Sequence, residues 1–257
     1  MEYNRIADIK RLQIITKTLT EHLPPNATIL DVGCGNGIIS RGIGSKGFNV
    51  LGIDVSDKAI EKARELNTLP NVTFEVISAE QLVNDGKTYQ GVICSEVLEH
   101  LNQPEKLLNT LYQSLTDDGI LVVTVPNGRG PREVFVTKPV IKIQRKKGFL
   151  WKILSKSKKL LGYSGTTIQS DADDLTHVQF FSKKALYKLA SENNFRIVDF
   201  NVTNFMDDVF PFSLITRKSK TLQKFDAYVA DHLPHQVAGS FVTVWKKDKA
   251  TPVPKNM

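Results

Sequence analysis

The chain has 257 residues, of which 41% are hydrophobic and 24% charged, a mixture typical of globular proteins and not of collagen-like or disordered chains. Two cysteines, Cys34 and Cys94, are too few for a secreted disulfide framework, and the apolar runs are too short to cross a membrane, so we expect a cytoplasmic protein without an export signal. The length suits one domain over residues 1–257, and 34 basic against 27 acidic residues give a net charge of +7.

Short β-branched runs alternate with helical patterns over the first half of the chain, which predicts βαβ units and a parallel sheet. The expected strands are Thr28–Val32, Asn49–Ile53, Val72–Val76, Gly91–Cys94 and Ile120–Val125. A helix should open at the glycine loop after the first strand, and others should cover Asp57–Leu66, with Ser56 as its N-cap, and Gln103–Leu115. Residues 117–119 should then turn the chain into the fifth strand.

After the fifth strand, in the second half of the chain, strand and helix patterns no longer alternate. We expect residues 128–176 to form a helical insertion, followed by a helix over Ser182–Asn193 that Ser182 caps. Alternating apolar and polar residues predict a half-buried antiparallel pair, Phe195–Val202 and Phe241–Trp245. A further helix is expected between them, from about Thr221 to His232.

A glycine loop follows the first buried strand, with glycines at positions 33, 35 and 37. Glycines let the backbone approach a ligand closely and point amide groups at it. The spacing here is G-x-G-x-G, and Ile38 stands where the dinucleotide fingerprint G-x-G-x-x-G has its third glycine. The loop therefore disfavours a pyrophosphate as the ligand.

Asp54 directly follows the second strand, where an open α/β sheet presents a carboxylate to a ribose diol. Two vicinal hydroxyls can donate two hydrogen bonds to one carboxylate. Alternatively, Asp54 only caps the helix that begins near Ser56. The strand and glycine loop that precede it favour the ribose role.

These residues resemble the motifs of the class I S-adenosylmethionine-dependent methyltransferases, including the methyltransferase type 11 and ubiquinone-biosynthesis types. The matching segments are Ile29–Gly37, Asp54, Tyr89–Cys94 and Leu115–Asn127, in the order that the family has them. The resemblance implies a Rossmann-like α/β fold with a seven-stranded sheet in the order 3-2-1-4-5-7-6 and an antiparallel last strand. It also implies S-adenosyl-L-methionine as the cofactor.

The same resemblance implies which residues border the cofactor. The glycines would lie beside its methionine part, and Asp31 would steady the loop near its amino group. The expected cofactor-binding residues are Asp31, Gly33, Cys34, Gly35, Gly37, Asp54, Val55, Ala79, Glu80 and Glu96. Ser78 stands where the family usually has Asp before Ala, so adenine recognition would rest on the Ala79 backbone and the Ser78 hydroxyl.

Glu96, Glu99 and His100 come directly after the fourth strand. If a helix opens there, residues at i, i+3 and i+4 share one face. That face would lie at the carboxyl edge of the sheet, beside the glycine loop. Two carboxylates and an imidazole so close together need a cation or hydrogen-bond donors as compensation.

The element E-x-x-E-H, followed later by H-x-x-F at His177, is similar to the ubiquinone-biosynthesis O-methyltransferases and the small-RNA 3′-terminal 2′-O-methyltransferases. The resemblance to the RNA enzymes implies a divalent cation, Mg²⁺ or Mn²⁺, held by Glu96, Glu99, His100 and His177. A second interpretation makes Glu99, His100 and His177 catalytic or substrate-contacting groups without a metal, because a hydroxyl nucleophile must lose its proton. In a third, the histidines only pack at the cofactor rim or in a lid.

The predicted insertion carries most of the excess positive charge, with nine basic and no acidic residues between Phe135 and Ser170. Residues 149–161 are amphipathic on a helical wheel, with lysines opposite the apolar residues. Such a helix can pack as a lid, or it can contact an anionic membrane with Trp151 near the boundary. A nucleic-acid partner is less favoured, because few aromatic residues stand among the lysines.

The sequence therefore predicts transfer of a methyl group from S-adenosylmethionine to an oxygen of a small-molecule or lipid-like acceptor. The protein would be cytoplasmic, with or without peripheral membrane contact. One alternative is RNA ribose 2′-O-methylation with a metal-assisted site, and another is a cofactor-binding or membrane-docking module without turnover. A nicotinamide oxidoreductase is disfavoured by the glycine spacing.

Overall fold

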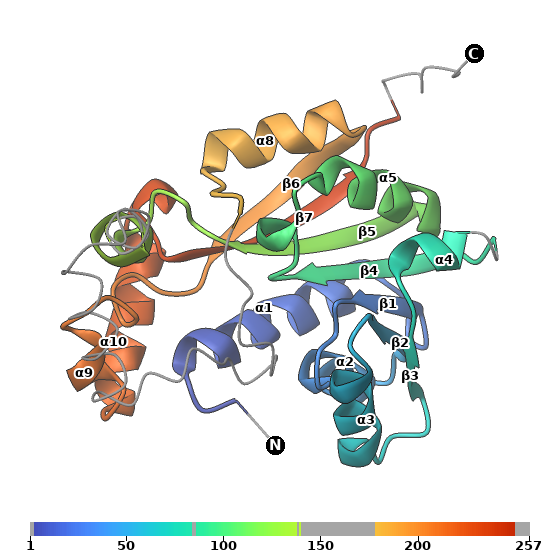
Figure 1. The fold of residues 1–257 in the computed structure, drawn as a ribbon, viewed down its shortest axis with the longest axis horizontal. Helices are drawn as coiled ribbons and strands as arrows, with labels where there is room; N and C mark the ends of the chain where they lie inside the picture. Colours follow the sequence, from blue (N-terminus) through green and yellow to red (C-terminus); the bar gives the residue numbers. More distant parts are fainter. Residues whose placement is uncertain (1–2, 84–85, 138, 140–177, 250–257) are drawn as a thin grey trace, which may run out of the picture.

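A single mixed sheet of seven strands organises the computed structural model, which describes residues 3–83, 86–137, 139 and 178–249 (Figure 1). The strand order is β3-β2-β1-β4-β5-β7-β6. The strands are β1 (Thr28–Val32), β2 (Asn49–Asp54), β3 (Val72–Val76), β4 (Tyr89–Ser95), β5 (Leu115–Pro126), β6 (Phe195–Val202) and β7 (Ser240–Lys247). Strands β1 to β5 pair in parallel, and β7 is antiparallel to both β5 and β6. The predicted fold and strand order are confirmed.

Helices cover both faces of this sheet. The longer ones are α1 (Ile6–His22), α3 (Asp57–Leu66), α5 (Pro104–Ser114), α8 (Lys183–Glu192) and α10 (Lys220–His232). The shorter ones are α2 (Ile38–Gly44), α4 (Ala79–Val83), η1 (Leu98–His100), η2 (Glu133–Thr137), α9 (Ser213–Thr216) and η3 (His235–Val237). The order of strands and helices is that of a doubly wound α/β fold.

Side chains that point alternately to the two faces of the sheet divide the core into two layers. In β1, Ile29 packs with α1, α2 and α3, whereas Leu30 and Val32 pack with α4, α5 and α8 on the other face. Successive side chains of a strand point to opposite faces, so a strand covered on both sides must be apolar throughout. This explains why the first-half strands read as short continuous apolar runs.

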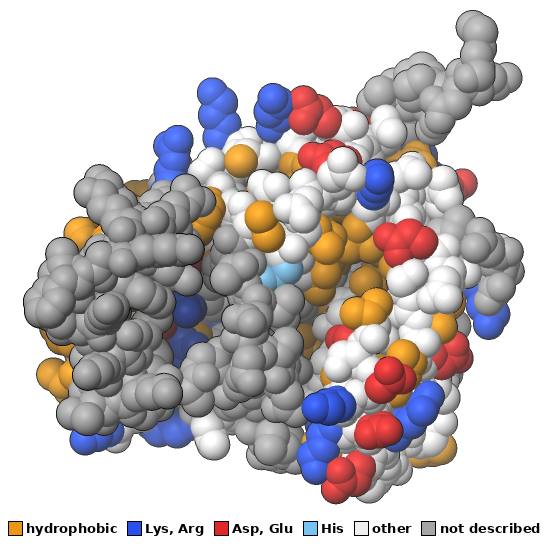
Figure 2. All heavy atoms as spheres, viewed as in Figure 1, with side chains coloured by type: hydrophobic (Ala, Val, Ile, Leu, Met, Phe, Trp, Pro, Cys, Tyr) orange, Lys and Arg blue, Asp and Glu red, His pale blue; other side chains and the backbone are white. Residues whose placement is uncertain are grey.

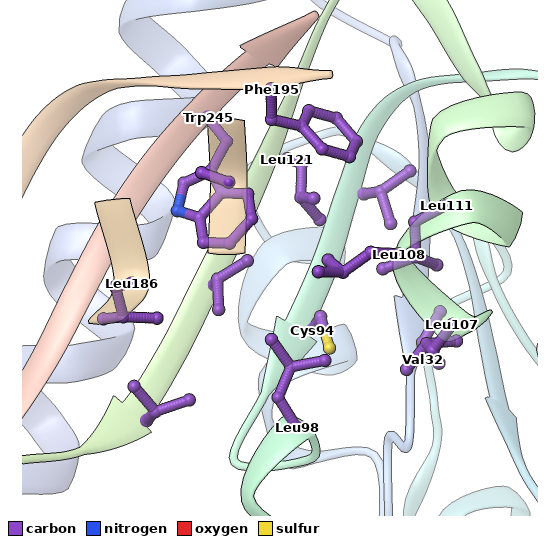
Figure 3. Packing of buried hydrophobic residues seen from close by; sticks show 14 of the residues in the cluster. Val32, Cys94, Leu98, Leu107, Leu108, Leu111, Leu121, Leu186, Phe195 and Trp245 are labelled. Atoms are coloured by element: carbon purple, nitrogen blue, oxygen red, sulfur yellow. The ribbon is translucent and has the colours of Figure 1, made fainter. Parts of the chain in front are cut away.

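Aromatic side chains fill the layer between the sheet and helices α5 and α8 (Figure 3). Trp245 of β7 and Phe195 of β6 are fully buried and meet edge to face, with 5.7 Å between their ring centroids. The indole Nε1 donates a hydrogen bond of 2.7 Å to Thr243 Oγ1, which satisfies the buried polar atom. The antiparallel end of the sheet thus shares one packed layer with β1 and β4.

Several local expectations are confirmed and others are wrong. Ser56 and Ser182 cap α3 and α8, accepting hydrogen bonds from Ala59 N and Ala185 N. The expected turn at 117–119 lies instead inside β5, which begins at Leu115 and contains an irregularity in its pairing with β4. Strand β7 is buried along Ser240–Trp245 and is not half-buried, because its side chains enter the core on both faces of the sheet.

Most of the predicted insertion lies outside the described residues, including the amphipathic segment 149–161 and His177. Its first residues, up to 137, form a turn and the short helix η2. Within the part of the chain that is described, no helix combines the length and the apolar character that crossing a bilayer requires.

Replacing Trp245 by Ala should lower the free energy of unfolding by about 3–5 kcal/mol, because the change leaves a large cavity beside Phe195. Val198→Ala, at an exposed position of the edge strand β6, should change it by less than about 0.5 kcal/mol. Urea denaturation followed by circular dichroism measures both values. Equal effects of the two substitutions would contradict the packing described for this end of the sheet.

Candidate functional site

The predicted site residues gather where the parallel strands end. The glycine loop follows β1, Asp54 closes β2, Ala79 follows β3 and Glu96 follows β4. Because these strands are parallel and adjacent, their carboxyl ends lie along one edge of the sheet (Figure 1). On the face shown in Figure 2, apolar side chains and a histidine gather near the centre, over the region where Figure 1 draws the ends of β4 and β5.

The glycine loop is a tight turn that only glycines fit. Gly33, Gly35 and Gly37 all have a positive φ, between 55° and 73°, which side chains disfavour. A Cβ on Gly37 would stand 2.3 Å from the Phe74 ring, and one on Gly33 would stand 2.6 Å from Val97 Cγ2. The loop therefore packs against the neighbouring strands without space for a side chain.

Asp54 ties the glycine loop to the start of α3. Its Oδ2 accepts a hydrogen bond of 2.9 Å from Gly35 N, and its Oδ1 accepts one of 2.9 Å from Ser56 N. The N-cap of α3 is Ser56, whose Oγ accepts a hydrogen bond from Ala59 N, so Asp54 is not the cap that the alternative predicted. Ribose binding by Asp54 stays a prediction, because each of its carboxylate oxygens has a second acceptor position.

Asp31 is a buried carboxylate beneath the loop. Ser40 Oγ of α2 donates a hydrogen bond of 2.5 Å to its Oδ2. Burial raises the pKa of Asp31 to about 7, and the Ser40 hydrogen bond partly opposes the shift. The neighbouring Cys34 is buried as well, and burial raises the pKa of its thiol. Cys34 thus contributes to the packing of the loop, and the charge of Asp31 changes with pH.

The other residues expected to border the cofactor differ in exposure. Val55, next to Asp54, is 75% exposed, whereas Ala79 is buried at the start of α4 and Glu80 is exposed. Ser78 N donates to Gln81 Oε1 at 2.7 Å, which fixes the turn into α4. An exposed valine beside a carboxylate offers an apolar contact for a flat ring.

Glu96 does not begin a helix, so the prediction that Glu96, Glu99 and His100 share a helical face is wrong. Its φ of 58° is left-handed, and only the short 3-10 turn η1 follows. Glu96 N donates to Thr124 O at 3.0 Å, and Thr124 Oγ1 donates to Glu96 Oε1 at 2.9 Å. These bonds to β5 replace those that a helix would have supplied, and such a strained residue is a frequent sign of function.

Arg11 was not anticipated from the sequence. It lies on α1 with its guanidinium buried, 3.6 Å from Glu96 Oε2 and 3.5 Å from Asp8 Oδ1. A signal was present, because Arg11 falls in the stripe Ala7, Arg11, Ile15 and Leu19 that α1 buries. A charged residue on a buried stripe needs partners, and of the two here Asp8 is in the same helix whereas Glu96 is 85 positions away.

Glu99 is the most unusual group in the site. The residue is 1% exposed, and its carbonyl oxygen accepts hydrogen bonds from Val178 N and Gln179 N. Its two carboxylate oxygens have no hydrogen-bond partner among the described residues, and His100 Nε2 lies 3.9 Å from Oε1. A buried carboxylate without donors is costly, so its place here indicates a function.

Burial raises the pKa of Glu99 well above its usual range. The nearby Glu96 and Glu133 carboxylates raise it further, whereas the residue's own backbone N–H and the Arg11 guanidinium lower it. Glu133, on η2, is also 1% exposed and was not anticipated from the sequence, since a single glutamate after β5 carries no motif. Glu99 can therefore hold a proton at a pH where an exposed glutamate cannot.

The predicted metal ligands are only partly placed. Within residues 3–83, 86–137, 139 and 178–249, no three His, Cys, Asp or Glu side chains are arranged to hold a metal ion. His177 lies outside these ranges, so the complete set of Glu96, Glu99, His100 and His177 stays a prediction.

Comparison with known families and curated proteins adds a second line of argument. The sequence model of a family described as "Methyltransferase domain" matches residues 3–199. The ubiquinone biosynthesis O-methyltransferase of Rickettsia typhi is 38% identical over 102 residues, which cover 38% of this chain and 41% of that protein. The one of Hydrogenovibrio crunogenus is 36% identical over 118 residues, 45% of each chain. The match thus spans less than half the length of these relatives.

Solved structures with the same fold come from several enzymes. Magnesium protoporphyrin IX methyltransferase of Synechocystis, with bound S-adenosylhomocysteine, superposes with a TM-score of 0.54 at 16% identity, over 94% of this chain and 84% of that one. The 1,6-didemethyltoxoflavin-N1-methyltransferase of Burkholderia thailandensis gives 0.55 at 16% identity, over 92% and 78%. At this identity the likeness concerns the fold alone.

The free energy of unfolding should depend on the ionisation of Asp31. Because its folded pKa is raised, the protein gains stability from protonated Asp31 at low pH and loses it as the pH rises from about 4 to about 7. Asp31→Asn keeps an acceptor for Ser40 and should remove this part of the pH dependence. Urea denaturation at a series of pH values measures the free energy of unfolding of both proteins. If this free energy changes with pH equally in both, the pH dependence does not come from Asp31.

Glu99→Gln should stabilise the protein at about pH 8 by about 1–3 kcal/mol. The folded pKa of Glu99 is raised, so its contribution to stability is present at low pH and is lost as the pH passes that pKa. Glu105→Gln, at an exposed position of α5, is the matched control and should have almost no effect. A destabilised Glu99→Gln variant at this pH would show that the carboxylate is compensated.

Proposed function

This chain belongs to the class I S-adenosylmethionine-dependent methyltransferases, and on that premise we propose that it methylates a hydroxyl oxygen of a small, lipophilic acceptor. The acceptor class is suggested by the curated relatives, whose names describe O-methylation in ubiquinone biosynthesis. The observation that carries the proposal is the buried Glu99 carboxylate, which lies at the carboxyl edge of the sheet next to the glycine loop. A hydroxyl acceptor needs a group there that takes its proton.

The residues at the sheet edge fit S-adenosylmethionine, which supplies an electrophilic methyl group when bound. Asp54 keeps acceptor positions for a ribose diol while it fixes the loop. Val55 and Ala79, with Glu80 beside them, would border the adenine. The tight turn at the three glycines brings backbone close to the methionine part, and the carboxylates of Asp31 and Glu96 favour a positively charged ligand.

Glu99 and His100 would then handle the acceptor's proton. His100 Nε2 lies 3.9 Å from Glu99 Oε1, so the imidazole can take the proton from the acceptor hydroxyl and pass it to the Glu99 carboxylate, whose raised pKa favours accepting it. His177 remains a further candidate for acceptor contact. Methyl transfer is an in-line displacement, and the site therefore needs to align the acceptor oxygen and remove its proton.

A cation-assisted form of the same reaction is the alternative that the sequence predicts. Carboxylate and imidazole groups of Glu96, Glu99, His100 and His177 suit Mg²⁺ or Mn²⁺. In the described geometry the Glu96 oxygens are engaged by Thr124 and Arg11, so cation binding would require that Glu96 release Arg11. Calorimetric titration of the wild type and His177→Ala with each ion tests this; a wild type that gives no binding signal would remove the cation.

The place of the reaction follows from the acceptor class. A cytoplasmic enzyme with a lipid-like acceptor benefits from contact with the membrane periphery, and the amphipathic residues 149–161 would provide it. The protein would then be a single domain over residues 1–257. Its catalytic groups would lie at the edge of the sheet, and its insertion, residues 128–176, would contact the membrane. Support for this part comes from the sequence alone.

Glu99→Gln should lower kcat by about 100-fold or more while S-adenosylmethionine still binds, because the variant loses proton transfer and not the cofactor pocket. Formation of S-adenosylhomocysteine is measured with phenols that carry or lack an alkyl tail. Glu105→Gln should keep the wild-type rate. If calorimetry shows that S-adenosylmethionine binds but the wild type forms no product with any phenol, the proposed acceptor class is wrong. If Glu99→Gln is as active as the wild type, Glu99 takes no part in the chemistry.

A further inference from the structure

Helix α10 presents its large apolar side chains away from the protein. Its buried residues are the small or polar Gln223, Ala227 and Ala230. This face lies against α1, where Gln223 Oε1 accepts a hydrogen bond of 2.9 Å from Ile6 N. Leu222, Phe225 and Tyr228 are exposed instead. An ordinary surface helix has the opposite arrangement, with its apolar stripe toward the core.

Helix α9 and the residues before it extend this apolar face. Nearly half of the large apolar side chains that the structure exposes fall between positions 210 and 228. We call them the α9–α10 surface, which consists of Phe210, Phe212, Leu214, Ile215, Leu222, Phe225 and Tyr228. The most exposed of them, Ile215 and Phe225, are each 64% exposed, and Phe212 and Phe225 share a shallow groove of about 200 Å³. Contiguous exposed apolar patches of this kind mark interaction sites.

Basic residues alternate in sequence with the apolar residues of the α9–α10 surface. Arg217, Lys218, Lys220 and Lys224 are all exposed within the same stretch of chain. Asp226 is the single acidic residue between positions 210 and 228, and its oxygens accept hydrogen bonds from Phe205 N and Met206 N at 2.8 and 2.7 Å. The surface therefore combines exposed aromatic rings with a net positive charge.

The α9–α10 surface is held in place by bonds to the rest of the protein. Asp226 links α10 to the segment after β6, as its two backbone contacts show. Thr216 Oγ1 donates to Asp207 O at 2.7 Å, and Arg5 approaches Asp207 at 3.4 Å. Figure 1 shows α9 and α10 on the side toward which β4 and β5 point, which is the side of the candidate site.

We propose that the α9–α10 surface binds the face of an anionic lipid bilayer. Aromatic and aliphatic side chains would enter the boundary between headgroups and acyl chains, and the lysines between them in sequence would meet lipid phosphates. A second copy of the chain fits less well, because two such surfaces would bring their positive charges together. This inference goes beyond the proposed function, since bilayer binding needs no turnover, and it concerns residues other than 149–161.

Vesicle sedimentation tests the proposal on the full chain, with phosphatidylcholine alone and with added phosphatidylglycerol. The wild type should sediment with the anionic vesicles. Lys218→Gln and Lys224→Gln should each weaken binding about fivefold. Joint replacement of Ile215 and Phe225 by Ser should weaken it more than about tenfold. All four positions are exposed, so circular dichroism melting should be almost unchanged.

Matched controls lie elsewhere on the protein. Lys188→Gln removes an exposed lysine from α8, and Val198→Ser removes an exposed apolar side chain from β6, and both should bind like the wild type. A wild type that sediments with neither kind of vesicle would overturn the proposal, as would variants that bind as tightly as the wild type. A dimer in solution that the Ile215 and Phe225 changes dissociate, without vesicle binding, would assign the surface to a second copy and would overturn it as well. None of these readings depends on methyl transfer.

Discussion

Charged side chains buried at the carboxyl edge of an apolar sheet are the constraint on which the site depends. Strands β1 and β4 are covered on both faces, so the groups that follow them have little water available. Asp31 and Glu99 are nevertheless buried there, Glu96 lies half-buried beside them, and Arg11 approaches Glu96 from α1. Such an arrangement costs stability, and it places ionisable groups where their pKa values can be shifted.

Hydrogen bonds between loops hold this arrangement together. Asp54 joins the glycine loop to α3, and Thr124 joins the end of β4 to β5 through Glu96. The bonds between Asp54 and Gly35 and between Thr124 and Glu96 connect segments that are distant in sequence but adjacent in the sheet. The site is therefore preorganised by the strand order, and a cofactor would meet groups that are already positioned.

Much of the fold could be predicted because its signals are local. Buried strands read as apolar runs, and Ser56 and Ser182 precede helices as N-caps. The pairing of Arg11 with Glu96 and the left-handed φ of Glu96 could not be predicted, because both depend on contacts across the sheet. The full burial of β7 follows from the entry of its side chains into the core on both faces of the sheet, which composition alone does not reveal. The glycine loop and Asp54 were predictable since their spacing reflects backbone geometry.

The position of β7 has a consequence for biosynthesis. Strand β5 is made well before β7, and β6 also precedes it, yet neither pairs with the other in the sheet. Until Ser240–Lys247 has left the ribosome, β5 has an unfilled hydrogen-bonding edge and β6 has no partner strand. A nascent chain in this state exposes aggregation-prone surface, so this half of the domain can complete its sheet only after translation of β7.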